Sequence, residues 1–126
     1  MEFDPSAPIW TQLVGEFTRL IVVGHWASGD RIPGVRDLAV ELKVNPNTVQ
    51  RALAELDRQG LSRVERAAGR FITGDLDVIE AARQALAAEA AVGYARRAQG
   101  LGMSLAAARE LLGRQWPNVT QEEGIR

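Results

Sequence analysis

Residues 30–56 read DRIPGVRDLAVELKVNPNTVQRALAEL, and this stretch carries two apolar stripes at helical spacing. In each stripe the apolar residues fall at i, i+3, i+4 and i+7, the pattern of a buried helix face. The two stripes are Val35, Leu38, Ala39 and Leu42, followed by Val49, Ala52, Leu53 and Leu56. Because Lys43 and Val44 interrupt the pattern, the sequence predicts two short helices packed across a tight turn. Upstream, a helical face predicted to join the core is formed by Trp10, Leu13, Phe17 and Leu20.

The second helix has a well-defined start. Asn45 precedes a proline, which pushes it out of the helical region and makes it a natural N-cap. Pro46 then takes the first helical position, where its missing N–H costs nothing. The polar side chains of the following turn and a half are Asn47, Thr48, Gln50 and Arg51. They project from a helix whose opposite face is anchored, which is the layout of a recognition helix in a helix-turn-helix domain.

A short β-hairpin is predicted behind this helix. Gly60 is expected to end the helix at the C′ position. Residues 61–65 and 70–73 are predicted to form two strands, joined by the sequence Arg66-Ala67-Ala68-Gly69. The arginines of this region, opposed by Glu65 alone, are Arg58, Arg63, Arg66 and Arg70. A helix-turn-helix followed by a basic hairpin predicts a winged helix.

These motifs resemble the N-terminal domain of GntR-type bacterial transcription regulators. The matching motifs are P-I-W-x-Q-L at Pro8–Leu13, G-D-R-I-P-x-x-R-D-L-A at Gly29–Ala39, V-N-P-N-T-V-x-R-A-L-x-x-L at Val44–Leu56, G-L at Gly60-Leu61 and G-x-F-I at Gly69–Ile72. The short chain and its small helical remainder are similar to the YtrA-like subgroup of the family. The resemblance implies a compact homodimeric repressor, of a kind that often controls transporter operons.

Two features depart from the family pattern. Gly34 stands where the family usually has serine; glycine can still act as an N-cap, but a hydroxyl that could hold a phosphate is missing. The wing of the family usually reads R-G-x-G-T-F-V, whereas residues 66–72 read RAAGRFI. One glycine is lost, which stiffens the tip, and an arginine is gained.

The sequence predicts a DNA-binding surface built from the two short helices and the wing. Its predicted residues are Arg36, Asn45, Asn47, Thr48, Gln50, Arg51, Arg66, Gly69 and Arg70. Asn and Gln can read adenine bidentately, but which of them reaches a base is not visible in the sequence. Asn45 is expected mainly to cap its helix. Arg66 and Arg70 are expected to contact phosphates or the minor groove, with simple solvation as the alternative.

Two further arginines have alternatives of their own. Arg36 lies in the first turn of its helix, where the macrodipole disfavours a cation, and a bound phosphate would reverse this effect. It could instead form a surface ion pair with Asp30 or Asp37. Arg51 could contact a phosphate or pair with Glu55 at i+4.

The charge balance places a condition on DNA binding. The chain has 15 Lys and Arg against 16 Asp and Glu, so its net charge is −1, and residues 1–74 hold nine of each sign. Nucleic-acid binders are often basic. Affinity must therefore come from where the individual charges sit.

The remainder of the chain is predicted to form two helices. Residues 77–100 are alanine-rich and favour a helix. Gly100 and Gly102 break it, and Ser104 caps a second helix that Pro117 stops. Two helices this short cannot build a core or a large ligand pocket of their own. A second copy of the chain is the expected partner, and packing on their own winged helix is the alternative. The predicted dimerisation residues are Ile79, Ala82, Leu86, Ala90, Gly93, Leu105, Ala108, Leu112 and Trp116.

The composition disfavours several other classes of protein. The chain has no cysteine and a single histidine, His25, so neither disulfides nor a metal site is expected. No stretch approaches the ~18 apolar residues of a membrane span and no signal pattern precedes Pro8, so a cytoplasmic location is expected. Without a nucleophile–base pair, a glycine-rich phosphate loop or a metal cluster, neither an enzyme nor a cofactor is expected.

We therefore expect a mainly α fold with a small β-hairpin. A winged helix-turn-helix DNA-binding domain is predicted at residues 1–74, a two-helix dimerisation segment at 75–118 and a flexible tail at 119–126. The predicted function is sequence-specific transcription regulation by a homodimeric repressor that binds an inverted-repeat operator in double-stranded DNA. The alternative is a winged helix that mediates protein interactions without binding duplex DNA. The operator sequence, the regulated genes and the existence of a small-molecule effector are not visible in the sequence.

Overall fold

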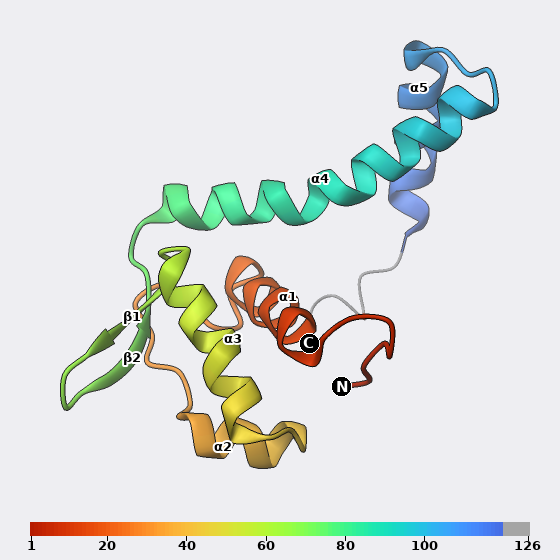
Figure 1. The fold of residues 1–126 in the computed structure, drawn as a ribbon. Helices are drawn as coiled ribbons and strands as arrows, with labels where there is room; N and C mark the ends of the chain where they lie inside the picture. Colours follow the sequence, from red (N-terminus) through yellow and green to blue (C-terminus); the bar gives the residue numbers. More distant parts are fainter. Residues whose placement is uncertain (120–126) are drawn as a thin grey trace. The chain divides into compact units, whose positions relative to one another are not determined.

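A computed structural model describes residues 1–119 of the chain. Over this range the fold is mainly helical with one two-stranded antiparallel hairpin, as predicted (Figure 1). The chain separates into two compact units, residues 1–83 and 84–126, which are described one at a time. The elements, in chain order, are α1 (Ile9–Val22), α2 (Val35–Leu42), α3 (Pro46–Arg58), β1 (Ser62–Glu65), β2 (Gly69–Ile72), α4 (Leu76–Gly100), α5 (Leu105–Gln115) and the 3-10 helix η1 (Trp116–Asn118).

Local sequence sets both ends of the helix-turn-helix. α2 ends where Lys43 adopts a left-handed conformation with φ of 57°, and the chain then turns into α3. The side-chain oxygen of Asn45 caps α3 by accepting a hydrogen bond from the backbone N–H of Asn47 at 2.7 Å. Gly60, just after the C-cap of α3, has φ of 79°, a conformation that favours glycine. The predicted caps of the recognition helix are therefore confirmed.

The wing is a hairpin with a third segment alongside it. β1 and β2 pair in antiparallel register over their full length. The chain before α2 adds to β2, because the Ile32 N–H donates to the Arg70 carbonyl at 3.0 Å and the Ile72 N–H donates to the Asp30 carbonyl at 2.9 Å. These bonds tie the base of the wing to the start of the helix-turn-helix.

One hydrophobic core holds the first unit together, and α1 packs on α3 across it. Its largest fully buried side chains are Phe17, Leu13, Ile21, Leu53, Leu56, Leu61, Ile72 and Val49. The Trp26 ring stacks on Phe17 at the margin, with ring centroids 5.0 Å apart. The predicted core face of α1 is confirmed at Leu13 and Phe17, but Trp10 is only partly buried.

The first unit continues into α4. Ile79 is 7% exposed and belongs to the core, and Val78 and Ala82 pack against it. Nη2 of Arg83 donates a hydrogen bond to the Val22 carbonyl at 2.6 Å. The sequence pattern assigns Ile79 to a dimer surface, but its own chain buries it, because the first two turns of α4 pack onto the core. The winged-helix unit therefore extends to Arg83.

In the second unit, α5 packs against the later part of α4 through small side chains. Ala98 and Ala108 are buried, and the Tyr94 hydroxyl donates a hydrogen bond to the Ala108 carbonyl at 2.7 Å. Ser104 caps α5 as predicted, accepting from the Ala107 N–H at 3.1 Å. The sequence pattern also assigns Ala108 to the dimer surface, but it lies against α4 of its own chain.

The other dimerisation residues predicted on the later part of α4 and on α5 to η1 remain on the surface of the described chain. They are Leu86, Ala90, Gly93, Leu105, Leu112 and Trp116. No helix within residues 1–119 is long and apolar enough to cross a membrane. In the same range, no three His, Asp or Glu side chains are grouped so that they could hold a metal ion. Of the predicted tail, residues 120–126 lie outside the described residues.

Candidate nucleic-acid interface

The exposed face of α3 carries the polar side chains that the sequence predicts to read DNA. Val49 and Leu53 are fully buried on the opposite face, which fixes the helix on the core. Asn47 and Gln50 are exposed, and Thr48 is half-buried. A helix held in this way can enter a major groove with its N-terminal side chains leading.

Asn45 uses its side-chain oxygen to complete the helix end. The 2.7 Å hydrogen bond from the Asn47 N–H uses one of the two lone pairs of that oxygen and orients the amide. Bidentate recognition of adenine needs both the oxygen and the NH₂ group of an amide side chain. Asn45 therefore keeps one lone pair and its NH₂ donors for a contact with DNA, in an orientation that the cap fixes.

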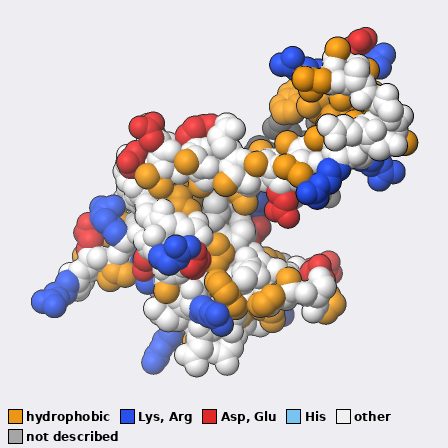
Figure 2. Space-filling model, turned by 45° about the horizontal axis from the view of Figure 1, so that its top comes forward, with side chains coloured by type: hydrophobic (Ala, Val, Ile, Leu, Met, Phe, Trp, Pro, Cys, Tyr) orange, Lys and Arg blue, Asp and Glu red, His pale blue; other side chains and the backbone are white. Residues whose placement is uncertain are grey.

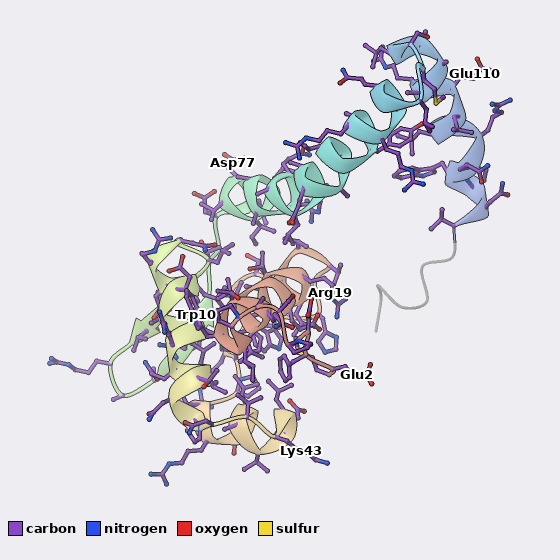
Figure 3. All side chains as sticks on the ribbon, turned by 45° about the vertical axis from the view of Figure 1, so that its right-hand side comes forward. Glu2, Trp10, Arg19, Lys43, Asp77 and Glu110 are labelled. Carbon is purple, nitrogen blue, oxygen red and sulfur yellow. The ribbon has the colours of Figure 1, made fainter. Side chains whose placement is uncertain are left out.

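Arg51 packs on an aromatic ring and not on an acidic partner. Its guanidinium carbon lies 4.2 Å from the centroid of the Trp10 ring. Trp10 is labelled in Figure 3. Glu55, the alternative partner, instead accepts hydrogen bonds from Arg58 and Gln59. The hydrogen bonds from Arg58 and then Gln59 lower the pKa of Glu55 to about 2. The pair between Arg51 and Glu55 does not form, and Trp10 orients a cation that forms no ion pair with a carboxylate within residues 1–119.

Arg36 lies at the start of α2, where the helix has no side-chain cap. Gly34 occupies the N-cap position and supplies no side-chain hydrogen bond. Among the described residues Arg36 forms no ion pair, so neither Asp30 nor Asp37 neutralises it. A phosphate at this point would meet backbone N–H groups, the positive end of the helix dipole and a guanidinium together.

The arginines of the wing differ in their surroundings. Arg66 lies at the exposed tip and has no ion-pair partner within residues 1–119. Arg63 pairs with Glu65 at 3.0 Å. Arg70 donates two hydrogen bonds to the Asp57 carboxylate, and its side chain is only 13% exposed. The sequence predicts a DNA contact for Arg70, but the structure places it in an internal pair with α3.

The tip of the wing is tightly folded. Gly69 has φ of 117°, and a Cβ at this position would lie 2.6 Å from Nε of Arg31. Ala67 has φ of 65°, in the left-handed region that costs an L-residue with a side chain roughly 1–2 kcal/mol. Ala67 stands at the first glycine of the family's wing pattern. Gly69 therefore allows a close approach of Arg31, and Ala67 is under backbone strain.

Arg31 belongs to this surface but was not among the residues predicted from the sequence. It borders a groove of about 380 Å³ between α3, the start of α2 and the wing. The residues that line the groove are Arg31, Ile32, Pro33, Gly34, Gln50, Val64, Gly69 and Arg70. The available signal was its place in the motif at residues 29–39. Its position beside the wing follows from the pairing of this segment with β2, which the sequence pattern did not predict.

Arginines outside the ion pairs are the cations that this face can offer to DNA phosphates. On this face, the arginines without an acidic partner in the described part of the chain are Arg31, Arg36, Arg51 and Arg66. Lys and Arg side chains stand out as separate projections and do not merge into one continuous patch (Figure 2). Any attraction of this face for phosphates therefore depends on the positions of these four guanidinium groups, because the domain as a whole is neutral.

Comparisons with known proteins agree with this geometry. The family described as "Bacterial regulatory proteins, gntR family" matches residues 11–72, from α1 to the end of the wing. The chain is 31% identical over 103 residues to the uncharacterized HTH-type transcriptional regulator YhcF of Bacillus subtilis. The matched region covers 82% of this chain and 85% of YhcF. The chain is also 37% identical over 75 residues to the HTH-type transcriptional repressor YtrA of Bacillus subtilis, and this matched region covers 58% of each protein.

A solved structure is similar over nearly the whole chain. It is a GntR family transcriptional regulator from Listeria monocytogenes, with a TM-score of 0.80 and 32% sequence identity. The similarity covers 94% of this chain and 100% of the Listeria chain. These relatives are described as transcription regulators and not as enzymes.

Proposed function

Since the chain belongs to the GntR family of bacterial regulatory proteins and is a DNA-binding transcription regulator, we propose that it acts as a homodimeric repressor on an inverted-repeat operator. Each protomer places the N-terminal half of α3 in a major groove and the wing along the flanking backbone. The observation that carries this proposal is the capped start of α3, where exposed Asn47 and Gln50 are flanked by arginines without acidic partners.

We assign separate roles to the arginines and the amide side chains. Arg31, Arg36 and Arg66 are proposed to contact phosphates, which position the protein without reading sequence. Asn47 and Gln50 are proposed to read base edges, because exposed amides can pair with adenine in the major groove. The assignment is supported by the exposure of these residues and by their positions: Asn47 and Gln50 lie on α3, Arg36 on α2, Arg31 just before α2 and Arg66 in the turn of the wing.

The roles are tested by selecting bound duplexes from random sequence and titrating the variants by fluorescence anisotropy. Arg36→Ala should weaken binding to the selected and a scrambled duplex alike and lower the salt slope by about one unit. Gln50→Ala should relax the preference at one position of each half-site, by ~1–3 kcal/mol. Arg114→Ala removes the same charge from α5 and is the matched control, with parental binding expected. Parental affinity and salt slope in Arg36→Ala would remove Arg36 from the interface.

The dimer is proposed to form through the second unit. Leu112 and Trp116 are apolar and largely exposed, and small residues such as Ala90 and Gly93 allow two backbones to approach closely. Two-fold symmetry then requires half-sites centred ~10 bp apart or a multiple of that distance. We place the winged-helix domain at residues 1–83, so the dimerisation segment begins after Arg83.

A charged substitution tests the dimer. Leu112→Glu should make the protein monomeric in light scattering and should weaken binding to the full repeat towards the affinity for one half-site. Val40→Glu introduces the same charge at an exposed position of α2 and should leave the dimer intact. A parent that is monomeric at micromolar concentration, or a Leu112→Glu variant that still dimerises, would overturn this assignment.

Repression is supported by the similarity to YtrA, which is described as a repressor. In a transcription assay with the selected operator overlapping a promoter, the protein should lower transcript yield, and Arg36→Ala should do so less. Activation in this assay would contradict the proposal. Absence of salt-dependent binding to any duplex would instead support a protein-interaction module.

Two further parts of the proposal concern a small-molecule effector and the location of the protein. The cavity between α4 and α5 is about 130 Å³, below the ~300–1,000 Å³ of typical ligand pockets. An effector site within a single α4–α5 hairpin is therefore not expected, and a ligand-induced change in dimer stability would argue for a site shared by two copies. The cytoplasm is proposed because a regulator must reach its DNA.

A further inference from the structure

A single carboxylate in the last turn of α3 connects the recognition helix to both strands of the wing. Oδ1 of Asp57 accepts a hydrogen bond from Oγ of Ser62 on β1 at 2.5 Å. Arg70 on β2 donates from Nε to Oδ1 at 3.1 Å and from Nη2 to Oδ2 at 3.0 Å. Ser62 is 5% exposed, the Arg70 side chain 13% and the Asp57 side chain 28%, so solvent screens these contacts only in part.

This cluster has two physical consequences. Pairing of a planar guanidinium with both oxygens of a carboxylate is directional, so it restricts the angle at which β2 meets α3. It also cancels the charge of Arg70 locally. The base of the wing is held by backbone bonds to Asp30 and Ile32, and Asp57 adds the side-chain link from α3.

We propose that Asp57 is a positioning residue that holds the wing against the recognition helix and withholds Arg70 from DNA phosphates. This inference rests on the proposed function, because it assigns a role within the proposed DNA interface. A released Arg70 adds a phosphate contact on any sequence, and such contacts carry no sequence information. Asp57 therefore lowers the affinity for duplexes of any sequence, and this raises the ratio of specific to non-specific affinity.

Asp57→Asn tests the inference in the full-length protein, because asparagine keeps the size of the side chain and an oxygen that can accept from Ser62. The variant should bind a scrambled duplex more tightly than the parent does. One added phosphate contact steepens the salt slope by ~0.9, so raising salt from 50 to 200 mM should cost the variant about 3.5-fold more affinity than the parent. The ratio of affinities for selected and scrambled duplexes should fall.

Two matched variants separate the charge from the fold. Arg70→Gln removes the cation and leaves the Asp57 carboxylate without its partner, so its salt slope should not exceed the parental value. The double variant Asp57→Asn/Arg70→Gln should return the slope to the parental value, since it removes the released cation. A general loss of structure would lower the affinity of all three variants and could not steepen the slope. Circular dichroism and urea unfolding check that each variant is folded.

Several results would overturn the inference. A folded Asp57→Asn variant with the parental salt slope removes the withholding role, while the proposed function stands. A slope below the parental value in the double variant means that Arg70 contacts phosphate in the parent, which also contradicts the inference. If Asp57→Asn does not fold, the double variant decides: the parental slope with a lower specificity ratio supports the inference. A parent that binds no duplex overturns the inference and the proposed function together.

Discussion

Replacing Ile79 with alanine tests which of two surfaces buries this side chain, the core of its own unit or a dimer interface. Ile79 is 7% exposed and packs in the core together with Val78 and Ala82. The substitution removes three methyl or methylene groups, worth ~0.8 kcal/mol each in transfer free energy, or ~2.4 kcal/mol in total. A cavity term adds to this, but its neighbours Val78 and Ala82 are only partly buried and can relax. We therefore expect a loss of about 2–3 kcal/mol, at the low end of the range for Ile→Ala.

The assay is urea unfolding followed by circular dichroism at two protein concentrations that differ tenfold. With an m-value of ~1–2 kcal/mol/M, the midpoint should fall by roughly 1–3 M. Because the side chain is buried by its own chain, the free-energy difference from the parent should be the same at both concentrations. Light scattering should show an unchanged oligomeric state.

Leu76→Ala is the matched control, since Leu76 begins the same helix and is 69% exposed. It should change the unfolding free energy by no more than ~0.5 kcal/mol. If Ile79→Ala unfolds like Leu76→Ala, or if its main effect is dissociation of a dimer, the assignment of Ile79 to the winged-helix core is wrong.

Three further predictions concern the first unit. Val49→Asp should abolish the cooperative thermal transition, because it buries an unpaired carboxylate, whereas Gln50→Asp on the exposed face should keep it; a parental melting curve for Val49→Asp would mean that the facing of α3 is wrong. Glu55 has a pKa lowered from 4.5 to about 2, so its stabilising effect is present above pH 4.5 and is lost as the pH falls towards 2. Glu55→Gln should therefore flatten the pH dependence of the unfolding free energy in that window, and an unchanged slope would contradict the lowered pKa. Ala67→Gly should stabilise the protein by about 0.5–1 kcal/mol, since relief of left-handed strain exceeds the extra backbone entropy of glycine; a lower melting temperature would argue against φ of 65° at this position.

The sequence was sufficient where the structure depends on neighbouring residues. The start of α3 follows from Asn45 and Pro46, and its end from Gly60, because caps act over one helical turn. The buried faces of α2 and α3 follow from periodicity for the same reason. The wing was predicted from two short strands around a turn. The observed strands differ from the predicted ones by one residue at three of their four ends.

The sequence was insufficient where a side chain had several partners of equal chemistry. Arg70 could be solvated, bind DNA or pair with any carboxylate in reach, and only the fold brings Asp57 to it. Likewise Arg51 meets Trp10 because α1 crosses α3 at that point, not because of their spacing in the chain. Periodicity correctly marked Ile79 as apolar and buried, but it cannot tell whether the burying surface belongs to the same chain or to a second one.

The Asn45 cap also limits how much sequence information one protomer can read. The hydrogen bond from the Asn47 N–H fixes the orientation of its amide, so in the proposed interface we expect bidentate readout of adenine from Asn47 and Gln50. Two fully specified base pairs occur by chance about once in every 16 positions of random DNA, far too often to mark one promoter among the competing sites of a genome. The remaining sequence specificity must come from the second half-site and from the deformability of the base pairs between the two half-sites. Operators of this protein should accordingly tolerate substitution within a half-site better than a change in the spacing of the two halves.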